Sequence, residues 1–179
     1  MGLNRENEII ERIKAGHAGD FEYLVRRYQK HLFCIVANLV HGVMVEDLVQ
    51  DVFLAAFARI QSFDSRRGSF RTWLYRIARN RALNARKKKR EEPLSPEMPV
   101  MADERTPDGD LLVKEAFGRL DQALSELRFQ DRMIFVLAEL DGCSYAQIAQ
   151  IEELALGTVK SRLARIKTKL REALKPYID

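Results

Sequence analysis

The segment between residues 68 and 90 interleaves aromatic, amide and arginine side chains in a way that suits unpaired nucleic acid. It reads GSFRTWLYRIARNRALN and then ends in the basic run RKKKR. Aromatic rings and arginine planes stack on bases, amides hydrogen-bond base edges, and arginines hold the backbone. Asn80 and Asn84 lie four residues apart, so a helix would place them on one polar face. Phe70 and Trp73 also fit a buried core position, and that alternative stays open.

A second candidate surface is acidic and precedes the first in the chain. Asp47, Gln50 and Asp51 are three and four residues apart, which places them on one face of a helix. Carboxylates on an otherwise apolar helix suit a basic partner, although a plain solvated surface explains the same spacing. The two carboxylates could also hold magnesium, but no phosphate-cradling glycine loop or lysine accompanies them.

Near the C-terminus, a short capped helix, a tight turn and a longer basic helix follow one another in the order of a helix-turn-helix. Ser144 and Gln147 have the spacing of a capping box, and the small Ala149 lets two helices approach closely. The second helix would reach base edges in the major groove and meet phosphates with its basic side chains. It presents Thr158, Lys160, Ser161, Arg162, Ala164, Arg165, Lys167 and Lys169. The alternative is an ordinary helical subdomain with a solvated basic face.

Charge is distributed in blocks along the chain, although the net charge is only +4. Residues 65–90 hold 11 basic residues and no acidic one, and residues 156–175 hold 7 basic residues against 1 acidic. Between these blocks, residues 91–110 hold 7 acidic residues and 1 basic residue. Concentrated like charge weakens a fold through self-repulsion, and a polyanion relieves that repulsion. The two basic blocks therefore favour nucleic acid as a partner.

The periodicity of apolar residues predicts an all-α protein, because nearly every folded stretch repeats at three and four residues and none alternates convincingly at two. Four of the five prolines lie in the acidic block, and proline disfavours helix in itself and in the preceding residue. We therefore expect two small helical domains, at residues 1–92 and 111–179, joined by a flexible acidic linker at 93–110. The expected helices span about 6–15, 20–39, 45–60, 69–88, 112–127, 130–140, 144–152 and 157–174.

Local signals predict where some of these helices begin and end. Asp20 is expected to cap the second helix, whereas Gly42 and Gly142 are expected to end the helices before them. The apolar pattern predicts that Phe57 and Trp73 are buried, together with the other apolar residues at helical spacing.

Three segments, taken together, resemble a bacterial sigma factor of the extracytoplasmic-function (ECF, group IV) type of the sigma-70 family. They read DLVQDVF at 47–53, FRTWLYRIARN at 70–80, and SYAQIA at 144–149 followed by GTVKSRL at 157–163. The order and spacing match the family along nearly the whole chain. The resemblance implies a transcription initiation factor with two conserved domains, regions 2 and 4, that directs RNA polymerase to promoters and promotes their melting.

The resemblance also implies a role for each surface. Core RNA polymerase would be bound through the β′ clamp and the β flap, with the clamp contacted by Asp47, Gln50 and Asp51. The minus-ten element would be recognised by the loop 63–68 and the helix after it, through Phe63, Ser69, Trp73, Arg76, Asn80 and Asn84. The minus-thirty-five element would be read by Thr158, Lys160, Ser161, Ala164 and Arg165. An anti-sigma factor commonly holds members of this family inactive.

The chain departs from the family in the turn of the helix-turn-helix. Glu152 and Glu153 stand where an apolar residue and then a glycine are usual, and Ala155 replaces a usual serine cap. A residue other than glycine in left-handed geometry is strained, and the loss of a cap costs about 1 kcal/mol. Two carboxylates near the DNA face would also repel phosphate.

Two other classes of function are alternatives to a sigma factor. A stand-alone helix-turn-helix regulator needs only the C-terminal motif and leaves the first 90 residues unexplained. An enzyme is disfavoured because His17, His31 and His41 form no metal-site or triad pattern. We expect no cofactor and no metal. Two distant cysteines, no signal segment and no apolar run of about 20 residues predict a cytoplasmic protein without membrane insertion.

Overall fold

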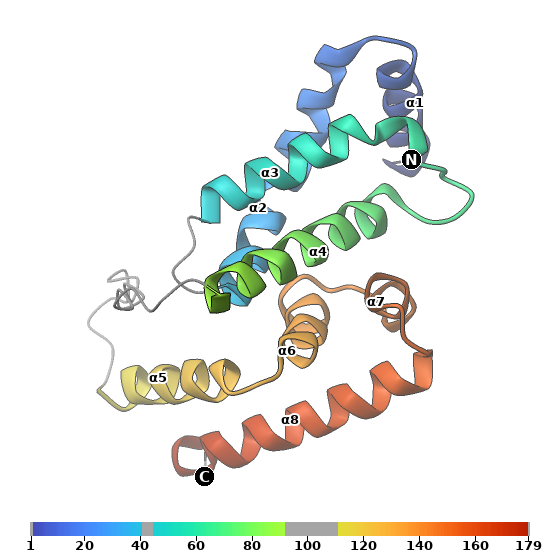
Figure 1. The fold of residues 1–179 in the computed structure, drawn as a ribbon. Coiled ribbons are helices and arrows are strands. Elements are labelled where there is room, and N and C mark those ends of the chain that lie inside the picture. The colour runs from blue at the N-terminus through green and yellow to red at the C-terminus, as the bar shows by residue number, and fades with distance from the viewer. Residues whose placement is uncertain (1, 41–44, 92–110, 179) are drawn as a thin grey trace. The chain divides into compact units, whose positions relative to one another are not determined.

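The computed structural model describes residues 2–40, 45–91 and 111–178, and every regular element in these ranges is helical (Figure 1). The described residues form two separate compact units, the first made of α1–α4 and the second of α5–α8. The prediction of an all-α protein with two domains is confirmed. The predicted linker at 93–110 and the predicted helix end at Gly42 lie outside the described residues.

The N-terminal unit contains four helices and two short 3₁₀ turns. α1 begins four residues before the predicted start, and α4 continues past the predicted end at residue 88. The predicted third helix is divided, because α3 ends at Ala58 and a 3₁₀ turn follows it. The elements are α1 (Gly2–Lys14), η1 (Ala18–Asp20), α2 (Phe21–Leu39), α3 (Val45–Ala58), η2 (Ile60–Ser62) and α4 (Phe70–Glu91).

The core of this unit lies between α2, α3 and α4, which pack pairwise against one another. Each helix supplies the apolar stripe that its periodicity predicts, for example Leu24, Leu32 and Val36 on α2. Two expectations are corrected. Phe57 is 40% exposed, and its ring packs edge-to-face with that of Phe21, with ring centroids 5.0 Å apart. Trp73 is half-buried rather than buried.

A buried carboxylate fastens α1 to α2. Glu6 is 2% exposed and accepts a hydrogen bond of 2.8 Å from the Tyr28 hydroxyl. Arg27 Nε lies 3.0 Å from the same carboxylate oxygen. Burial raises the pKa of Tyr28, and the hydrogen bond to Glu6 raises it further. The periodic pattern of α1 accounts for Ile10 and Ile13 in the core, but not for this polar contact.

Asp20 does not act as the predicted cap. It precedes α2 with helical backbone angles (φ −67°, ψ −14°), and its side chain makes no capping hydrogen bond. The reason is that η1 leads directly into α2, so the chain never takes the extended conformation that an N-cap needs. The Asp20 carboxylate instead forms an ion pair of 2.8 Å with Arg12 of α1.

The C-terminal unit packs α5, α6 and α7 against the long α8. The expected helix at 130–140 is divided, because its second half widens into a π-helical segment, η3. Gly142 adopts the predicted left-handed conformation (φ +64°) directly after that segment. The elements are α5 (Leu111–Ser125), α6 (Phe129–Phe135), η3 (Val136–Leu140), α7 (Tyr145–Glu152) and α8 (Leu156–Ile178).

Candidate nucleic-acid interface

α4 separates an apolar face from the polar face that the sequence predicts to meet DNA. Phe70 is fully buried, so the open alternative for this residue is resolved in favour of the core. Arg76, Asn80 and Asn84 are exposed at intervals of four residues, which places them along one side of the helix. The Asn80 side-chain oxygen accepts a hydrogen bond of 3.0 Å from Arg79 Nη1.

Three aromatic rings pack together at the start of α4. The centroids of Phe63, Phe70 and Trp73 lie 5.6 Å from one another. Phe63 is 4% exposed, so its ring packs into the core of the unit and offers almost no surface to a base, and its part in minus-ten recognition stays a prediction. The periodic pattern could not show this, because Phe63 lies between two helices. Phe63 instead supports Trp73, which keeps part of its surface accessible.

The segment before α4 is fixed by its own hydrogen bonds. Asp64 accepts two side-chain hydrogen bonds of 3.0 Å from Arg66, and these bonds lower the pKa of Asp64 to about 2. The predicted DNA-contact residue Ser69 acts as the cap of α4, because its hydroxyl accepts a hydrogen bond of 3.2 Å from the Thr72 amide. These hydrogen bonds therefore hold the loop and the start of α4 in this conformation without DNA.

The predicted acidic face of α3 is exposed and has an apolar part that the sequence analysis missed. Asp47, Gln50 and Asp51 are all exposed. Leu54 is 67% exposed and continues the same face, because it lies four residues after Gln50 and three after Asp51. The sequence alone gives this spacing, so Leu54 could have been assigned to the face without the structure. Beside the face, α2 and α3 enclose a groove of about 450 Å³, lined by Gln29, Lys30, Phe33, Glu46, Val49 and Gln50.

The helix-turn-helix is formed by α7 and α8, and the predicted capping box is present. Gln147 N donates to the Ser144 hydroxyl at 3.2 Å, and Ser144 N donates to the Gln147 side chain at 2.9 Å. Of the predicted minus-thirty-five residues, Lys160, Ser161, Ala164 and Arg165 are exposed and Thr158 is half-buried. The first three turns of α8 thus present these side chains along one flank.

Other basic side chains of α8 contact residues of the C-terminal unit. Lys167 forms an ion pair of 2.9 Å with Glu139, and Lys169 lies 3.5 Å from Glu126. Arg162 contacts Gln130 and Asp131. These three residues are among those that the helix was expected to present, and none of them belongs to the predicted minus-thirty-five set. These pairings join residues distant in sequence, so no local pattern indicated them.

The altered turn forms despite its two glutamates. Glu153 adopts the left-handed conformation (φ 56°, ψ 43°), and Leu154 N donates to Ala149 O at 3.0 Å, as in a Schellman motif. Glu152 is 2% exposed, so the expectation that both carboxylates lie near the DNA face is wrong for this residue. Glu152 occupies the inward-facing position at which the family usually has an apolar residue.

The left-handed geometry of Glu153 predicts that Glu153→Gly stabilises the C-terminal unit by about 1 kcal/mol, because glycine adopts this conformation without the Cβ strain. The measurement is the thermal midpoint of that unit in the full chain. Gly142→Ala is the matched control: Gly142 has a similar φ of +64°, and a Cβ there would meet nothing within 4 Å. It should destabilise by a similar amount, and two shifts of the same sign would contradict the prediction.

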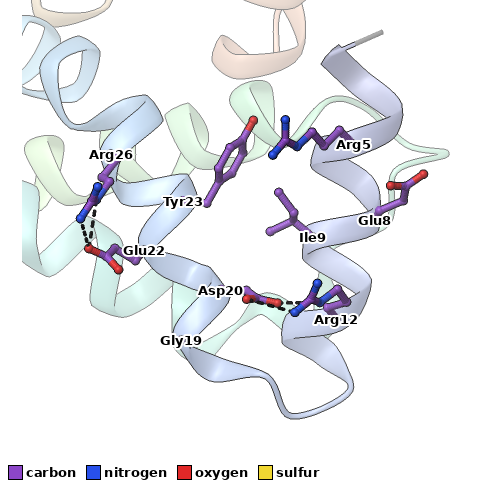
Figure 2. Close-up of a pocket in the computed structure, with 9 residues that line it drawn as sticks. All are labelled: Arg5, Glu8, Ile9, Arg12, Gly19, Asp20, Glu22, Tyr23 and Arg26. Atoms are coloured by element: carbon purple, nitrogen blue, oxygen red, sulfur yellow. Dashed lines mark hydrogen bonds and ion pairs between the residues drawn. The ribbon is translucent and has the colours of Figure 1, made fainter.

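A further hollow of about 520 Å³ lies between α1 and the start of α2 (Figure 2). Three arginines and three acidic side chains line it, and two pairs form, Arg12 with Asp20 at 2.8 Å and Arg26 with Glu22 at 2.6 Å. The guanidinium of Arg5 lies over the Tyr23 ring. Because the charges balance, this hollow has no preference for a polyanion.

Within 2–40, 45–91 and 111–178, no three His, Cys, Asp or Glu side chains come together as metal ligands. In the same part of the chain, no helix combines the length and apolar character needed to cross a bilayer.

Both halves of the chain match family models. The model for Sigma-70 region 2 matches residues 24–92, and the model for Sigma-70 region 4 matches residues 117–170. The ECF RNA polymerase sigma-E factor of Escherichia coli (strain K12) is 34% identical over 184 residues, covering 95% of this chain and 94% of that protein. The chain belongs to the ECF sigma factors of the sigma-70 family. It is thus a transcription initiation factor, and the resemblance predicted from the motifs is confirmed.

Further relatives agree with this assignment of the sigma factor. The RNA polymerase sigma-H factor of Pseudomonas aeruginosa is 28% identical, covering 97% of this chain and 96% of that protein. The sigma factor RpoE of Bartonella quintana, solved in complex with the anti-sigma factor NepR, is 29% identical with a TM-score of 0.71, covering 87% of this chain and 97% of that one. CnrH, solved with the cytosolic domain of CnrY, shares the fold with a TM-score of 0.70 at 24% identity, covering 94% of this chain and 96% of that one.

The two matches assign the surfaces of the sigma factor to its regions. Region 2 covers the acidic face of α3 and the polar face of α4, and region 4 covers α6, α7 and most of α8. The stand-alone regulator is disfavoured, because region 2 accounts for the half of the chain that such a regulator leaves unexplained. Helix α1 lies before the matched part of region 2.

Proposed function

We propose that this sigma factor binds core RNA polymerase, brings it to promoters with minus-ten and minus-thirty-five elements, and promotes their melting. The observation that carries the proposal is the arrangement of the N-terminal unit. Two helices that pack against each other present an acid-and-leucine face on α3 and an asparagine-and-arginine face on α4. One domain can therefore hold a protein partner and unpaired DNA at the same time. The proposal assigns the chain no catalytic step and a cytoplasmic location.

The acidic face of α3 is proposed to dock on the β′ clamp of polymerase through Asp47, Gln50 and Asp51. Leu54 adds apolar area at the end of the same face. An exposed apolar side chain beside carboxylates suits an interface in which charge guides association and burial slows dissociation. The β flap is proposed as a second polymerase contact.

The minus-ten element is proposed to bind along α4 through Trp73, Arg76, Asn80 and Asn84, with Ser69 fixing the helix start. Separating a duplex costs about 1.4 kcal/mol per base-pair step, and stacking a base on an aromatic side chain returns about 1–3 kcal/mol. Capture of one or two flipped bases can therefore nucleate opening without nucleotide hydrolysis. The half-buried Trp73 is the aromatic surface available for that step.

The minus-thirty-five element is proposed to be read by the start of α8 in the major groove. Lys160 and Arg165 would contact base edges or phosphates, and Ser161 and Thr158 would add hydroxyl contacts. Ala164 is exposed between them and offers a methyl surface for a thymine. Binding through these side chains should weaken as the salt concentration rises.

An anti-sigma factor is proposed as a further partner. The related RpoE of Bartonella quintana is solved in complex with the anti-sigma factor NepR, and it matches this chain over 87% of its length. An inhibitor that covers the acidic face of α3 would prevent polymerase from binding there.

Reconstituted transcription tests the proposal. The purified chain is mixed with core polymerase and a panel of promoter duplexes, and run-off transcripts and gel shifts are measured. We expect promoter-specific transcripts only when both proteins are present, and weak duplex binding by the chain alone. Tight, sequence-specific binding without polymerase would favour the stand-alone regulator instead.

Asn80→Ala is expected to reduce promoter opening roughly tenfold, because a lost hydrogen bond to an unpaired base is worth about 1–1.5 kcal/mol. Asn80 is exposed, so the affinity for core polymerase and the thermal midpoint should not change. Opening is measured by the fluorescence of 2-aminopurine placed in the minus-ten element. A template with a pre-melted bubble is the control and should largely rescue the variant. Normal opening of duplex promoters by Asn80→Ala would remove this residue from the interface.

A further inference from the structure

The end of α1 is joined to the segment before α4 by two reciprocal hydrogen bonds. Lys14 Nζ donates to Phe63 O at 2.8 Å, and Gln61 Nε2 donates to Lys14 O at 2.9 Å. The Lys14 ammonium also lies 5.7 Å from the centroid of the Phe63 ring. We call these contacts the Lys14–Gln61 clasp. It joins residues 47 and 49 positions apart in the sequence, so local periodicity could not predict it.

The clasp holds the residue on which the DNA-facing loop and its aromatic cluster both depend. Phe63 begins the loop 63–68, and its ring packs against Phe70 and Trp73. A shift of the Phe63 backbone would therefore move the start of the loop and remove support from the accessible ring of Trp73. α1 does not need the clasp to stay attached, because Glu6 and Ile10 already hold its other half against the core.

We propose that Lys14 is a positioning residue for promoter opening. Its ammonium fixes the carbonyl of Phe63, and Gln61 closes the clasp from the opposite side. The loop and Trp73 are thereby held in the geometry that receives an unpaired minus-ten base. The inference rests on the proposed function of α4, and it adds α1, which lies before the matched part of region 2, to the opening machinery.

Two variants break the clasp from its two sides. Lys14→Met keeps the aliphatic stem and removes the ammonium, and Gln61→Leu keeps the volume and removes the amide. Each is expected to slow opening of duplex promoters by holoenzyme roughly 5- to 10-fold, within the range for one lost hydrogen bond. Lys14→Arg retains a charged donor and should restore most of the rate. Glu11→Gln is the matched control, since Glu11 contacts Lys14 Nζ at 2.9 Å from the exposed side and is not part of the clasp.

Four further measurements distinguish positioning from other roles. The affinity for core polymerase should be unchanged in both variants, and the thermal midpoint should fall by no more than the few degrees that one lost hydrogen bond explains. The affinity of holoenzyme for a single-stranded minus-ten oligonucleotide should fall by the same factor as the rate. The dependence of that affinity on salt should keep its slope, whereas loss of a direct phosphate contact would reduce the slope by about 1.

The outcomes separate this inference from the function on which it rests. If the wild-type chain fails to open promoters with core polymerase, the proposed function is wrong. If the wild-type chain opens them and Lys14→Met opens them equally fast, only the positioning role is overturned. A lower thermal midpoint with no specific loss of oligonucleotide binding, or a reduced salt slope, also overturns it.

Discussion

Asp51→Arg is expected to lower the affinity of this sigma factor for core RNA polymerase by about 10- to 100-fold. The substitution places a cation in the middle of the acidic face of α3, opposite a partner surface proposed to be basic. Like charges brought together at an interface cost several kcal/mol. Asp51 is exposed, so the fold should lose no more than about 0.5 kcal/mol. Affinity is measured by fluorescence anisotropy of the labelled sigma factor titrated with core enzyme.

Two further variants separate the effect of charge on polymerase affinity from the effect of apolar contact. Glu8→Arg makes the same charge reversal on an exposed residue of α1, outside the acidic face, and should leave affinity unchanged. Leu54→Ala changes no charge and should lower affinity chiefly by speeding dissociation, since a large apolar contact is lost. If Glu8→Arg weakened binding as much as Asp51→Arg, net charge rather than the face of α3 would govern association.

Most of the helical framework could be predicted, because it depends on local rules. Apolar residues spaced three and four positions apart predicted the stripe of α2 from Leu24 to Leu39, and the structure buries that stripe. The capping box at Ser144 depends on residues only three positions apart, and it is present. Gly142 was predictable for the same reason, since a left-handed residue after a helix is a local requirement.

The residues whose burial was not predicted share a different cause. Contacts with residues far away in the sequence decide whether such a side chain is buried or exposed. Glu6 has the chemistry of a surface residue, yet Tyr28 lies 22 positions away and brings its carboxylate into the core. Glu152 is likewise buried where its charge predicted exposure. Phe57 shows the converse, because its position fits the apolar stripe of α3 and it is still 40% exposed. Polarity alone cannot identify such positions.

The candidate surfaces show the same difference between what local spacing predicts and what tertiary packing decides. Asp47, Gln50 and Asp51 were placed together by helix geometry, and the structure exposes all three. Phe63 was assigned through the resemblance, and only the packed structure shows that its ring faces the core. The assignment of individual residues to polymerase and promoter contacts therefore still depends on the variants described above.

Glu6→Leu is expected to destabilise the N-terminal unit by about 2–3 kcal/mol, although leucine is the more apolar side chain. The substitution leaves the Tyr28 hydroxyl buried without its acceptor and removes a charge-assisted hydrogen bond of 2.8 Å. Arg27 is half exposed and can regain water, so its lost ion pair adds little. The expected fall in the thermal midpoint of the unit is roughly 10 °C or more. Calorimetry of the full chain measures it.

A double variant tests whether the hydroxyl is the cause. Glu6→Leu combined with Tyr28→Phe removes both polar groups, so it should be more stable than Glu6→Leu alone. Alkaline pH gives an independent check, because the pKa of Tyr28 is raised in the folded state. Its contribution is complete below the unfolded pKa of about 10 and is lost as the pH rises toward the higher folded value. Tyr28→Phe should therefore show a smaller loss of stability above pH of about 10 than the wild-type chain. If the double variant were less stable than Glu6→Leu, burial of the hydroxyl would not explain the effect, and the Glu6–Tyr28 contact would not be what fastens α1 to α2.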